Sequence, residues 1–216
     1  MQVNLRSFLS GGICAALLGA VFSFSAAAQS GYGVNLIQNP GAEDGAADPG
    51  GEKVLPVPSW THVAGSFTTA QWGGSGLPAA NDPGPEDRGK NLFYGGPGGA
   101  KSSASQKIEL TIPPADVDTG TVSYKFSAWL GGFSNQGDYA TVTAEFLNTA
   151  GKAISSAMLG PVTVKDRKST TRLLEREKTG MLPKGTRSIL VTIAMTRLEG
   201  NDNDGSVDNL SLVLTK

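Results

Sequence analysis

Short apolar segments with a period of two run through most of the chain, and none of them is long enough to form an amphipathic helix. Each segment is rich in β-branched and aromatic residues and is bounded by Gly, Pro, Asn or Asp. This pattern is typical of strands that bury one face, because side chains alternate between the two faces of a sheet. We therefore predict an all-β, antiparallel sandwich without helices. The expected strands are 34–38, 59–63, 67–72, 91–94, 103–110, 121–130, 139–147, 153–159, 173–179, 188–196 and 207–214.

Segment 121–130 shows the alternation most clearly. Its apolar residues at even positions share one parity and are expected to face the core. Trp129 belongs to the other set, so we expect its side chain to face outward. Segment 188–196 alternates in the same way. The expected inward residues of 121–130 are Val122, Tyr124, Phe126, Ala128 and Leu130.

The first 28 residues have the features of a secretory signal. A start with one positive charge is followed by an apolar run over 8–24 and by small residues before an expected cleavage after Ala28. The run is short and diluted by Gly and Ser, which argues against a transmembrane anchor. The expected organisation is a signal peptide over 1–28 and a single β-sandwich domain over 29–216, in a secreted or periplasmic protein.

Cysteine content and charge exclude several kinds of function. The single cysteine, Cys14, lies in the expected signal peptide, so the rest of the chain has no disulfide, thiol nucleophile or thiolate metal ligand. Stability must then come from a hydrophobic core. The formal net charge is −1 and no block of Lys and Arg stands out. Nucleic acid and anionic membrane surfaces are therefore not expected partners.

Common catalytic motifs do not match this sequence. His62 is the only histidine and no G-x-S-x-G motif is present, which argues against a Ser-His-Asp triad. The Gly-rich segment 95–102 differs from a phosphate-binding loop at Ala100, and the acidic loop 199–205 lacks the spacing of an EF-hand. A glycosidase needs only two suitably spaced carboxylates, but the sequence nominates no pair. We therefore predict that the chain is not an enzyme.

Two long connections interrupt the strands, over 44–58 and 73–90. Both are rich in Gly, Pro and Asp. Loops of more than about 12 residues in a compact domain are usually functional or mobile. These two connections are therefore candidates for a functional surface.

Asp208 is an unusual residue for its position in the last expected strand. By strand parity it points the same way as Leu210 and Leu212, toward the core, where an unpaired carboxylate is costly. Glu43 lies in the turn after the first expected strand, and the first and last strands of a sandwich often lie side by side. Two carboxylates with nearby turn carbonyls would suit Ca²⁺. Alternatively, both residues are exposed in turns or accept hydrogen bonds from N–H groups.

Four motifs in a fixed order carry a resemblance to a known family. They occupy 35–43, 58–60, 126–132 and 204–212. In this order they resemble the galactose-binding-like jelly roll, which includes bacterial carbohydrate-binding modules and the F-box-associated sugar-recognition domain. The resemblance implies a jelly-roll β-sandwich with a structural calcium between Glu43 and Asp208. In the family this turn usually reads Asn-Gly-x-Phe, and the turn 39–42 differs from it. The resemblance therefore implies the two carboxylate ligands of the calcium site but not its carbonyl ligands.

A sugar-binding surface needs an aromatic face beside hydrogen-bonding groups, because a pyranose has apolar C–H faces and polar edges. Trp129 is expected to face outward next to the Gly131–Gly132 turn, and polar residues follow in the next loop. Trp60, Trp72 and Tyr94 could add aromatic surface, or could pack in the core or at an edge. The candidate ligand-binding residues are Trp129, Asn135, Gln136, Asp138 and Tyr139.

These observations favour an exported, non-catalytic module that binds carbohydrate or another extracellular ligand. Two alternatives remain at the level of sequence. The chain could be a structural or protein-interaction component of the cell envelope, since it carries the module alone. It could also be a small secreted hydrolase.

Overall fold

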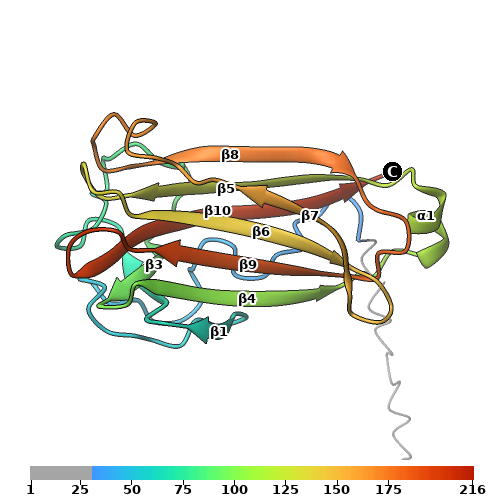
Figure 1. The fold of residues 1–216 in the computed structure, drawn as a ribbon, viewed down its shortest axis with the longest axis horizontal. Coiled ribbons are helices and arrows are strands. Elements are labelled where there is room, and N and C mark those ends of the chain that lie inside the picture. The colour runs from blue at the N-terminus through green and yellow to red at the C-terminus, as the bar shows by residue number, and fades with distance from the viewer. Residues whose placement is uncertain (1–30) are drawn as a thin grey trace, which may run out of the picture.

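Two five-stranded antiparallel sheets pack face to face in the computed structural model, which describes residues 31–216 (Figure 1). Sheet A has the strand order β2-β3-β10-β5-β8, and sheet B has the order β1-β4-β9-β6-β7. The expected signal peptide 1–28, with its cleavage site and Cys14, lies outside the described residues. Among residues 31–216, no helix is long and apolar enough to cross a bilayer. The predicted all-β sandwich is confirmed.

Most strands lie close to the expected segments, and β6, β7 and β9 coincide with them. Sheet A consists of β2 (Thr68–Gln71), β3 (Asn91–Pro97), β5 (Ser123–Gly132), β8 (Arg172–Met181) and β10 (Asp202–Thr215). Sheet B consists of β1 (Thr61–Ala64), β4 (Lys101–Glu109), β6 (Tyr139–Leu147), β7 (Ala153–Leu159) and β9 (Ser188–Thr196). The period-two pattern therefore located nearly every strand.

The first expected strand, 34–38, does not join either sheet as a regular strand. It lies beside β10 through an isolated bridge between Asn35 and Val213. The Asn35 side chain also donates to the Leu210 carbonyl at 2.9 Å and accepts from the Leu212 amide at 3.0 Å. A side chain thus takes over hydrogen bonds that a paired strand would make. The periodicity of apolar residues does not show where a side chain replaces backbone hydrogen bonds in this way.

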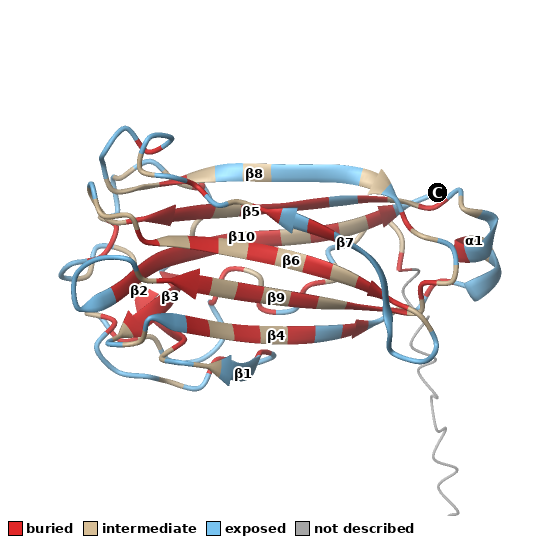
Figure 2. Cartoon of the chain, in the orientation of Figure 1, coloured by how far each residue is buried: buried red, intermediate tan, exposed pale blue. Residues whose placement is uncertain are grey.

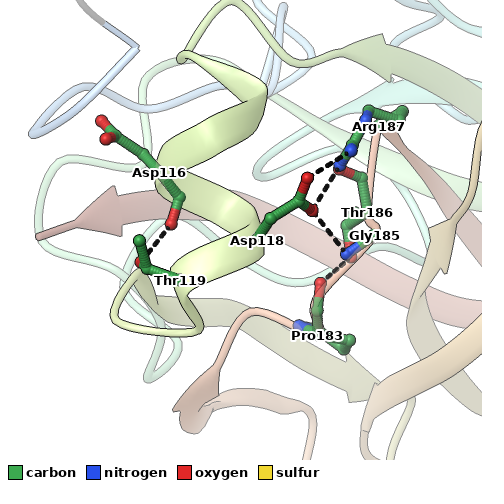
Figure 3. A network of polar contacts seen from close by, with 7 residues as sticks. All are labelled: Asp116, Asp118, Thr119, Pro183, Gly185, Thr186 and Arg187. Carbon is green, nitrogen blue, oxygen red and sulfur yellow. Dashed lines mark hydrogen bonds and ion pairs between the residues drawn. The ribbon is translucent and has the colours of Figure 1, made fainter.

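A short helix, α1 (Pro114–Thr119), connects β4 to β5 and corrects the prediction that the chain contains no helix. It is too short to show a helical period in the sequence, and Gly120 ends it in the left-handed conformation. Asp118 fixes the helix against the start of β9 (Figure 3). Its carboxylate accepts from both terminal nitrogens of Arg187, at 2.8 and 3.1 Å, and from the Gly185 amide. Figure 1 places α1 at one end of the sandwich.

The inner faces of the two sheets form one apolar core (Figure 2). All of the inward residues predicted for 121–130 are buried, and Phe126 and Leu130 are 0% exposed. Trp60 packs edge-on against Phe93 with ring centroids 5.4 Å apart. Burying one such side chain contributes about 1.5–3 kcal/mol. Strand β8 is different, because most of its residues are exposed or half-buried along the edge of sheet A.

A β-bulge in β10 changes the position predicted for Asp208. The register shifts between Asp208 and Ser211, so that Asp208 pairs with outward-facing Trp129 whereas Leu212 pairs with Phe126 of the core. Paired residues point to the same face of a sheet. Asp208 is therefore buried, as expected, but on the outer face of sheet A, and the prediction that it faces the core is wrong. Strand parity failed here because a bulge adds a residue to one strand.

Both long connections pack on the outer face of sheet A. Leu77 from the second connection joins a small apolar cluster with Ala70, Leu92 and Tyr94 of that face. Farther along the same connection, the Pro83 carbonyl accepts a hydrogen bond from the Leu173 amide of β8 at 2.9 Å. The two connections thus build a second layer over the sheet. This layer forms one wall of the candidate site.

Candidate functional site

A polar pocket of about 360 Å³ lies at the end of the sandwich opposite α1, where β5 ends and β10 begins (Figure 1). We call it the loop pocket. Its volume lies near the lower end of the range of about 300–1,000 Å³ for small-molecule sites. Parts of its wall come from the two long connections and from the β5–β6 and β9–β10 connections. The side chains that matter below are Glu52, Tyr94, Phe133, Gln136, Asp202 and Asp204.

The buried carboxylate of Asp138 holds the β9–β10 connection in place. Its Oδ1 accepts from the backbone amides of Leu198 and Glu199 at 2.6 and 3.0 Å. Its Oδ2 accepts from the backbone amide of Asp204 at 3.0 Å. Asp138 is 1% exposed. This one carboxylate therefore fixes the backbone that carries Asp204 to the pocket.

Arg167 holds the β5–β6 connection in place. Its guanidinium is fully buried and donates to the carbonyls of Ser134 and Gln136, each at 2.6 Å. Burial lowers the pKa of Arg167, while the negative charges of Asp138 and Asp204 act in the opposite direction. The backbone of Gln136 is thereby anchored to the β7–β8 connection. Both loops that border the pocket are thus held by buried charged groups.

Asp204 and Tyr94 form a buried pair at the pocket wall. The Tyr94 hydroxyl donates to Asp204 Oδ1 at 2.8 Å. Burial raises the pKa of Asp204 to about 6; the hydrogen bond from Tyr94 opposes this effect, and the charge of Asp138 adds to it. The pKa of Tyr94 is also raised, by burial and by the charge of Asp204. The pocket therefore contains a carboxyl group that titrates close to neutral pH.

Two acceptor atoms in the pocket remain free. The Oε1 atom of Gln136 is buried and has no hydrogen-bond partner within residues 31–216. The described residues also provide no donor to Asp204 Oδ2, since Tyr94 bonds the other oxygen. Asp204 Oδ2 is not among the fully buried unpaired atoms, so it is open to the pocket and can accept a hydrogen bond from a ligand. Gln136 Oε1 is buried, and because buried polar atoms normally have a partner, it is suited to a ligand donor that reaches it.

The structure separates the candidate ligand-binding residues. Gln136 lines the loop pocket, and Asn135 lies beside it as an exposed loop residue. Asp138 is buried beneath the pocket with both oxygens occupied, so its carboxylate supports the site rather than facing a ligand. Trp129 is half-buried on the outer face of sheet A, and Tyr139 lines a different hollow with Leu198. The predicted aromatic platform and polar rim are therefore not one surface.

Phe133, Asp202 and Asp204 line the pocket but are not among the site residues predicted from the sequence. Gly131 and Gly132 belong to β5 rather than to the expected turn. Phe133, the next residue, keeps the outward parity of Trp129, which is a signal that could have identified it. The acidic segment 199–205 fails as an EF-hand loop, and its overlap with the 204–212 motif assigns no ligand role to Asp202 or Asp204. Its two aspartates reach the pocket because Asp138, far away in sequence, binds this segment.

Glu43 and Asp208 lie near each other at a second position on sheet A. A Cβ atom on Gly41 would be 3.4 Å from Asp208 Oδ1 and 3.8 Å from the Glu43 Cγ. Glu43 Oε1 accepts from the amides of Lys90 and Asn91 at 2.9 and 2.8 Å. The first turn and the last strand thus meet as the resemblance implied.

Asp208 carries a strongly perturbed carboxyl group. It is 0% exposed, and Oδ2 accepts from the Trp72 indole Nε1 at 2.9 Å. Burial raises the pKa of Asp208 to about 8; hydrogen bonds from Trp72 and Asn209 oppose this effect, and the nearby charge of Glu43 adds to it. The guanidinium of Arg88 stacks over Trp72, 4.4 Å from the ring centroid. The hydrogen bonds that Asp208 accepts thus compensate only part of the cost of burying its negative charge.

The donor chemistry at this second position fits a hard cation. Glu43, Asp208 and the Asn209 Oδ1 all border Gly41, and each is an oxygen ligand of the kind that Ca²⁺ prefers. Within residues 31–216, no three His, Cys, Asp or Glu residues converge as a metal site. The remaining ligands would therefore be carbonyl, amide or water oxygens. Calcium at Glu43 and Asp208 stays a prediction.

Comparison with known proteins finds similarity in structure but not in sequence. No family model and no curated protein matches the chain. The enzymatically active domain of tailspike protein 4 from bacteriophage CBA120 superposes with a TM-score of 0.52 at 13% identity, over 84% of this chain. The chain spans only 21% of that tailspike chain. This likeness shows the fold alone.

Carbohydrate-binding modules are also among the similar structures. TmCBM61, solved with β-1,4-galactotriose, has a TM-score of 0.46 at 17% identity, covering 83% of this chain and 97% of that one. The CBM22-1 xylan-binding domain of Paenibacillus barcinonensis Xyn10C has a TM-score of 0.43 at 16% identity, covering 77% and 92%. The fold is a jelly-roll β-sandwich. The two antiparallel five-stranded sheets confirm the predicted β-sandwich.

The pKa of Asp208 predicts how stability changes with pH when divalent cations are chelated. The folded-state pKa, about 8, lies above the unfolded value of about 3.9, so folding favours the protonated group. The resulting stabilisation is fully present below about pH 4 and is lost as pH rises toward about 8. We expect the free energy of unfolding to fall by up to about 1.4 kcal/mol per pH unit in this window. Urea denaturation at a series of pH values in a chelating buffer measures this free energy.

Asp208→Asn is the matched variant for this measurement. It keeps the shape of the side chain but cannot ionise, so its stability should depend less steeply on pH than that of the wild type. Asp204 titrates in both proteins, so its contribution to the pH dependence of stability cancels when the two are compared. Equal slopes in the two proteins would show that Asp208 is ionised in the folded state throughout this range.

Proposed function

We propose that the chain is an exported, non-catalytic module that binds carbohydrate in the loop pocket. The observation that carries this proposal is a preformed polar pocket with free acceptor atoms on Gln136 and Asp204. Saccharides are rich in hydroxyl donors that such acceptors can bind. Phe133 and Tyr94 add aromatic surface for the C–H face of a sugar ring.

Rigid walls favour binding in such a small site. Asp138 and Arg167 hold the two bordering loops by hydrogen bonds to backbone groups, so little ordering is required when a ligand enters. Preorganisation of this kind raises affinity by lowering the entropic cost of association. A pocket of about 360 Å³ offers few contacts. We therefore expect weak recognition of a short saccharide segment.

A hydrolase is the second candidate, because the pocket contains three carboxyl groups and one of them has a raised pKa. The raised pKa of Asp204 is typical of a general acid, and Asp202 and Glu52 also line the pocket. Tyr94 already occupies one oxygen of Asp204, and burial disfavours its charged form. Both features also suit a binding site. Release of reducing ends from a bound glycan would identify the hydrolase.

Export is the part of the proposal that depends on sequence alone. It is supported by the basic start, apolar run and small residues before Ala28. An extracellular or periplasmic location would expose the loop pocket to glycans of the environment or of the cell surface.

The carbohydrate proposal is tested by a glycan array followed by calorimetry with the best ligand. Gln136→Ala and Phe133→Ala should each weaken binding by about 5-fold, because one hydrogen bond or one aromatic contact contributes about 1 kcal/mol. Trp129→Ala changes an aromatic residue of the same strand region outside the pocket and should leave affinity within about 2-fold.

Two results would contradict this proposal. Loss of binding in Trp129→Ala but not in Gln136→Ala would place the site on the outer face of sheet A. An array without any bound glycan would overturn the function itself.

The calcium prediction is tested by thermal unfolding with chelator and with excess Ca²⁺. Binding of one structural ion at Glu43 and Asp208 should raise the Tm by about 5 °C or more at a 100-fold excess over Kd. Asp208→Asn should remove this difference, whereas Asp204→Asn should retain it. A wild-type Tm that is the same in both buffers would contradict an exchangeable calcium ion at this position.

Processing after Ala28 is tested by intact-mass measurement of the exported protein. The expected N-terminus is Gln29, or pyroglutamate formed from it. Recovery of a chain that begins at Met1 from the membrane fraction would contradict the signal-peptide prediction.

A further inference from the structure

We infer that the loop pocket selects saccharides that carry a protonated amine, such as glucosamine units, over neutral and acidic sugars. This inference rests on the proposed function and specifies its ligand class. It follows from the charges and the free acceptors of the pocket residues.

The charged side chains that line the pocket are all acidic. They are Glu52, Asp202 and Asp204, and no Lys or Arg is among the lining residues. The whole chain is nearly balanced, with 18 basic and 19 acidic residues. The pocket is therefore far more acidic than the protein as a whole. A cationic ligand would be attracted to it and a uronic acid would be repelled.

Neighbouring basic groups do not neutralise this charge fully. Arg167 donates from its two terminal nitrogens to backbone carbonyls of the β5–β6 and β7–β8 connections, whereas its Nε has no partner within residues 31–216. Its positive charge lowers the pKa of Asp204. Arg197 donates to the carbonyls of Gly200 and Asn201 at 3.3 and 2.6 Å. Both guanidiniums bond loop backbone and keep their positive charges, but the four carboxyl groups of Glu52, Asp138, Asp202 and Asp204 outnumber them.

The free atoms of the pocket are acceptors. Asp204 is only 8% exposed, yet its Oδ2 receives no donor from the described residues. The Gln136 Oε1 is buried and equally unpaired. A sugar hydroxyl has one proton to donate and no charge, whereas an ammonium group has three donors and a positive charge. An amine can therefore satisfy both acceptors and compensate the carboxylates, with charge-assisted hydrogen bonds.

An organic cation fits this arrangement better than a metal ion. In the part of the chain that the structure describes, no three acidic side chains converge closely enough to bind one metal. An ammonium group on a sugar ring does not need a closed coordination shell. Its ring can also contact Phe133 while the amine faces the acidic wall.

The inference is tested by calorimetric titration with three oligosaccharides of equal length. These are a glucosamine tetramer, the N-acetylglucosamine tetramer, in which acetylation removes the charge, and cellotetraose, in which a hydroxyl replaces the amine. We expect the glucosamine tetramer to bind about 10-fold more tightly than either neutral tetramer at about pH 6.5, because charged hydrogen bonds are about twice as strong as neutral ones.

Three variants locate the source of this preference. Asp204→Asn and Asp202→Asn should each reduce it to about 3-fold or less, with melting curves measured to confirm folding. Glu109→Gln removes the same charge from the exposed surface of sheet B and should preserve the preference. If Glu109→Gln lost the preference for the glucosamine tetramer to the same extent, the overall charge of the protein rather than the pocket would cause this preference. That result would overturn the inference.

The outcomes separate this inference from the proposed function. Equal affinity of the wild type for the glucosamine tetramer and a neutral tetramer would overturn the amine preference and leave carbohydrate binding intact. Binding of none of the three tetramers would also overturn the inference, and the glycan array would then decide the function.

Discussion

Burial of apolar side chains between two sheets is the constraint on which the rest of this structure depends. No cysteine occurs in residues 31–216, so no disulfide supports the sandwich. Phe126 of β5 and Leu212 of β10 are paired in sheet A, and both are fully buried against sheet B. Each buried residue of this kind contributes about 1.5–3 kcal/mol. Most of this interior comes from regular strands, with additions such as Val57 of the first long connection and Val117 of α1, so most of the length of the long connections is left to build the second layer and the loop pocket.

Buried polar groups give the loops the rigidity that the core gives the sheets. Asp138 and Arg167 together bind the backbone on both sides of the pocket. Such groups are costly to bury without hydrogen bonds, so the loops have few alternative conformations that keep the carboxylate of Asp138 and the two terminal nitrogens of Arg167 bonded. The same low-dielectric setting raises the pKa of Asp204. Loop order and the electrostatics of the pocket thus have a common physical origin.

The sequence predicted the fold much better than the site. Alternation is a local property, so segments such as 139–147 and the inward face of β5 could be identified from neighbouring residues. The bulge at Asp208 is a local exception to alternation, and it reversed the face on which that carboxylate lies. The pocket depends on contacts between distant segments, for example the bond from the Asp204 amide to Asp138, which are 66 residues apart. No periodicity encodes such a contact, and so Asp138 was assigned to the ligand rather than to the support beneath it.

The exposed strand β8 has a consequence for association between copies of the chain. An edge strand presents unpaired backbone groups that can pair with another sheet and lead to aggregation. Here the edge carries Glu175, Arg176, Glu177 and Lys178 in succession. A second β8 that approached in register would have to bring these charges out of water and into close contact. Sheet A therefore ends at β8 in a strand that resists extension, which opposes growth into larger sheets at this edge.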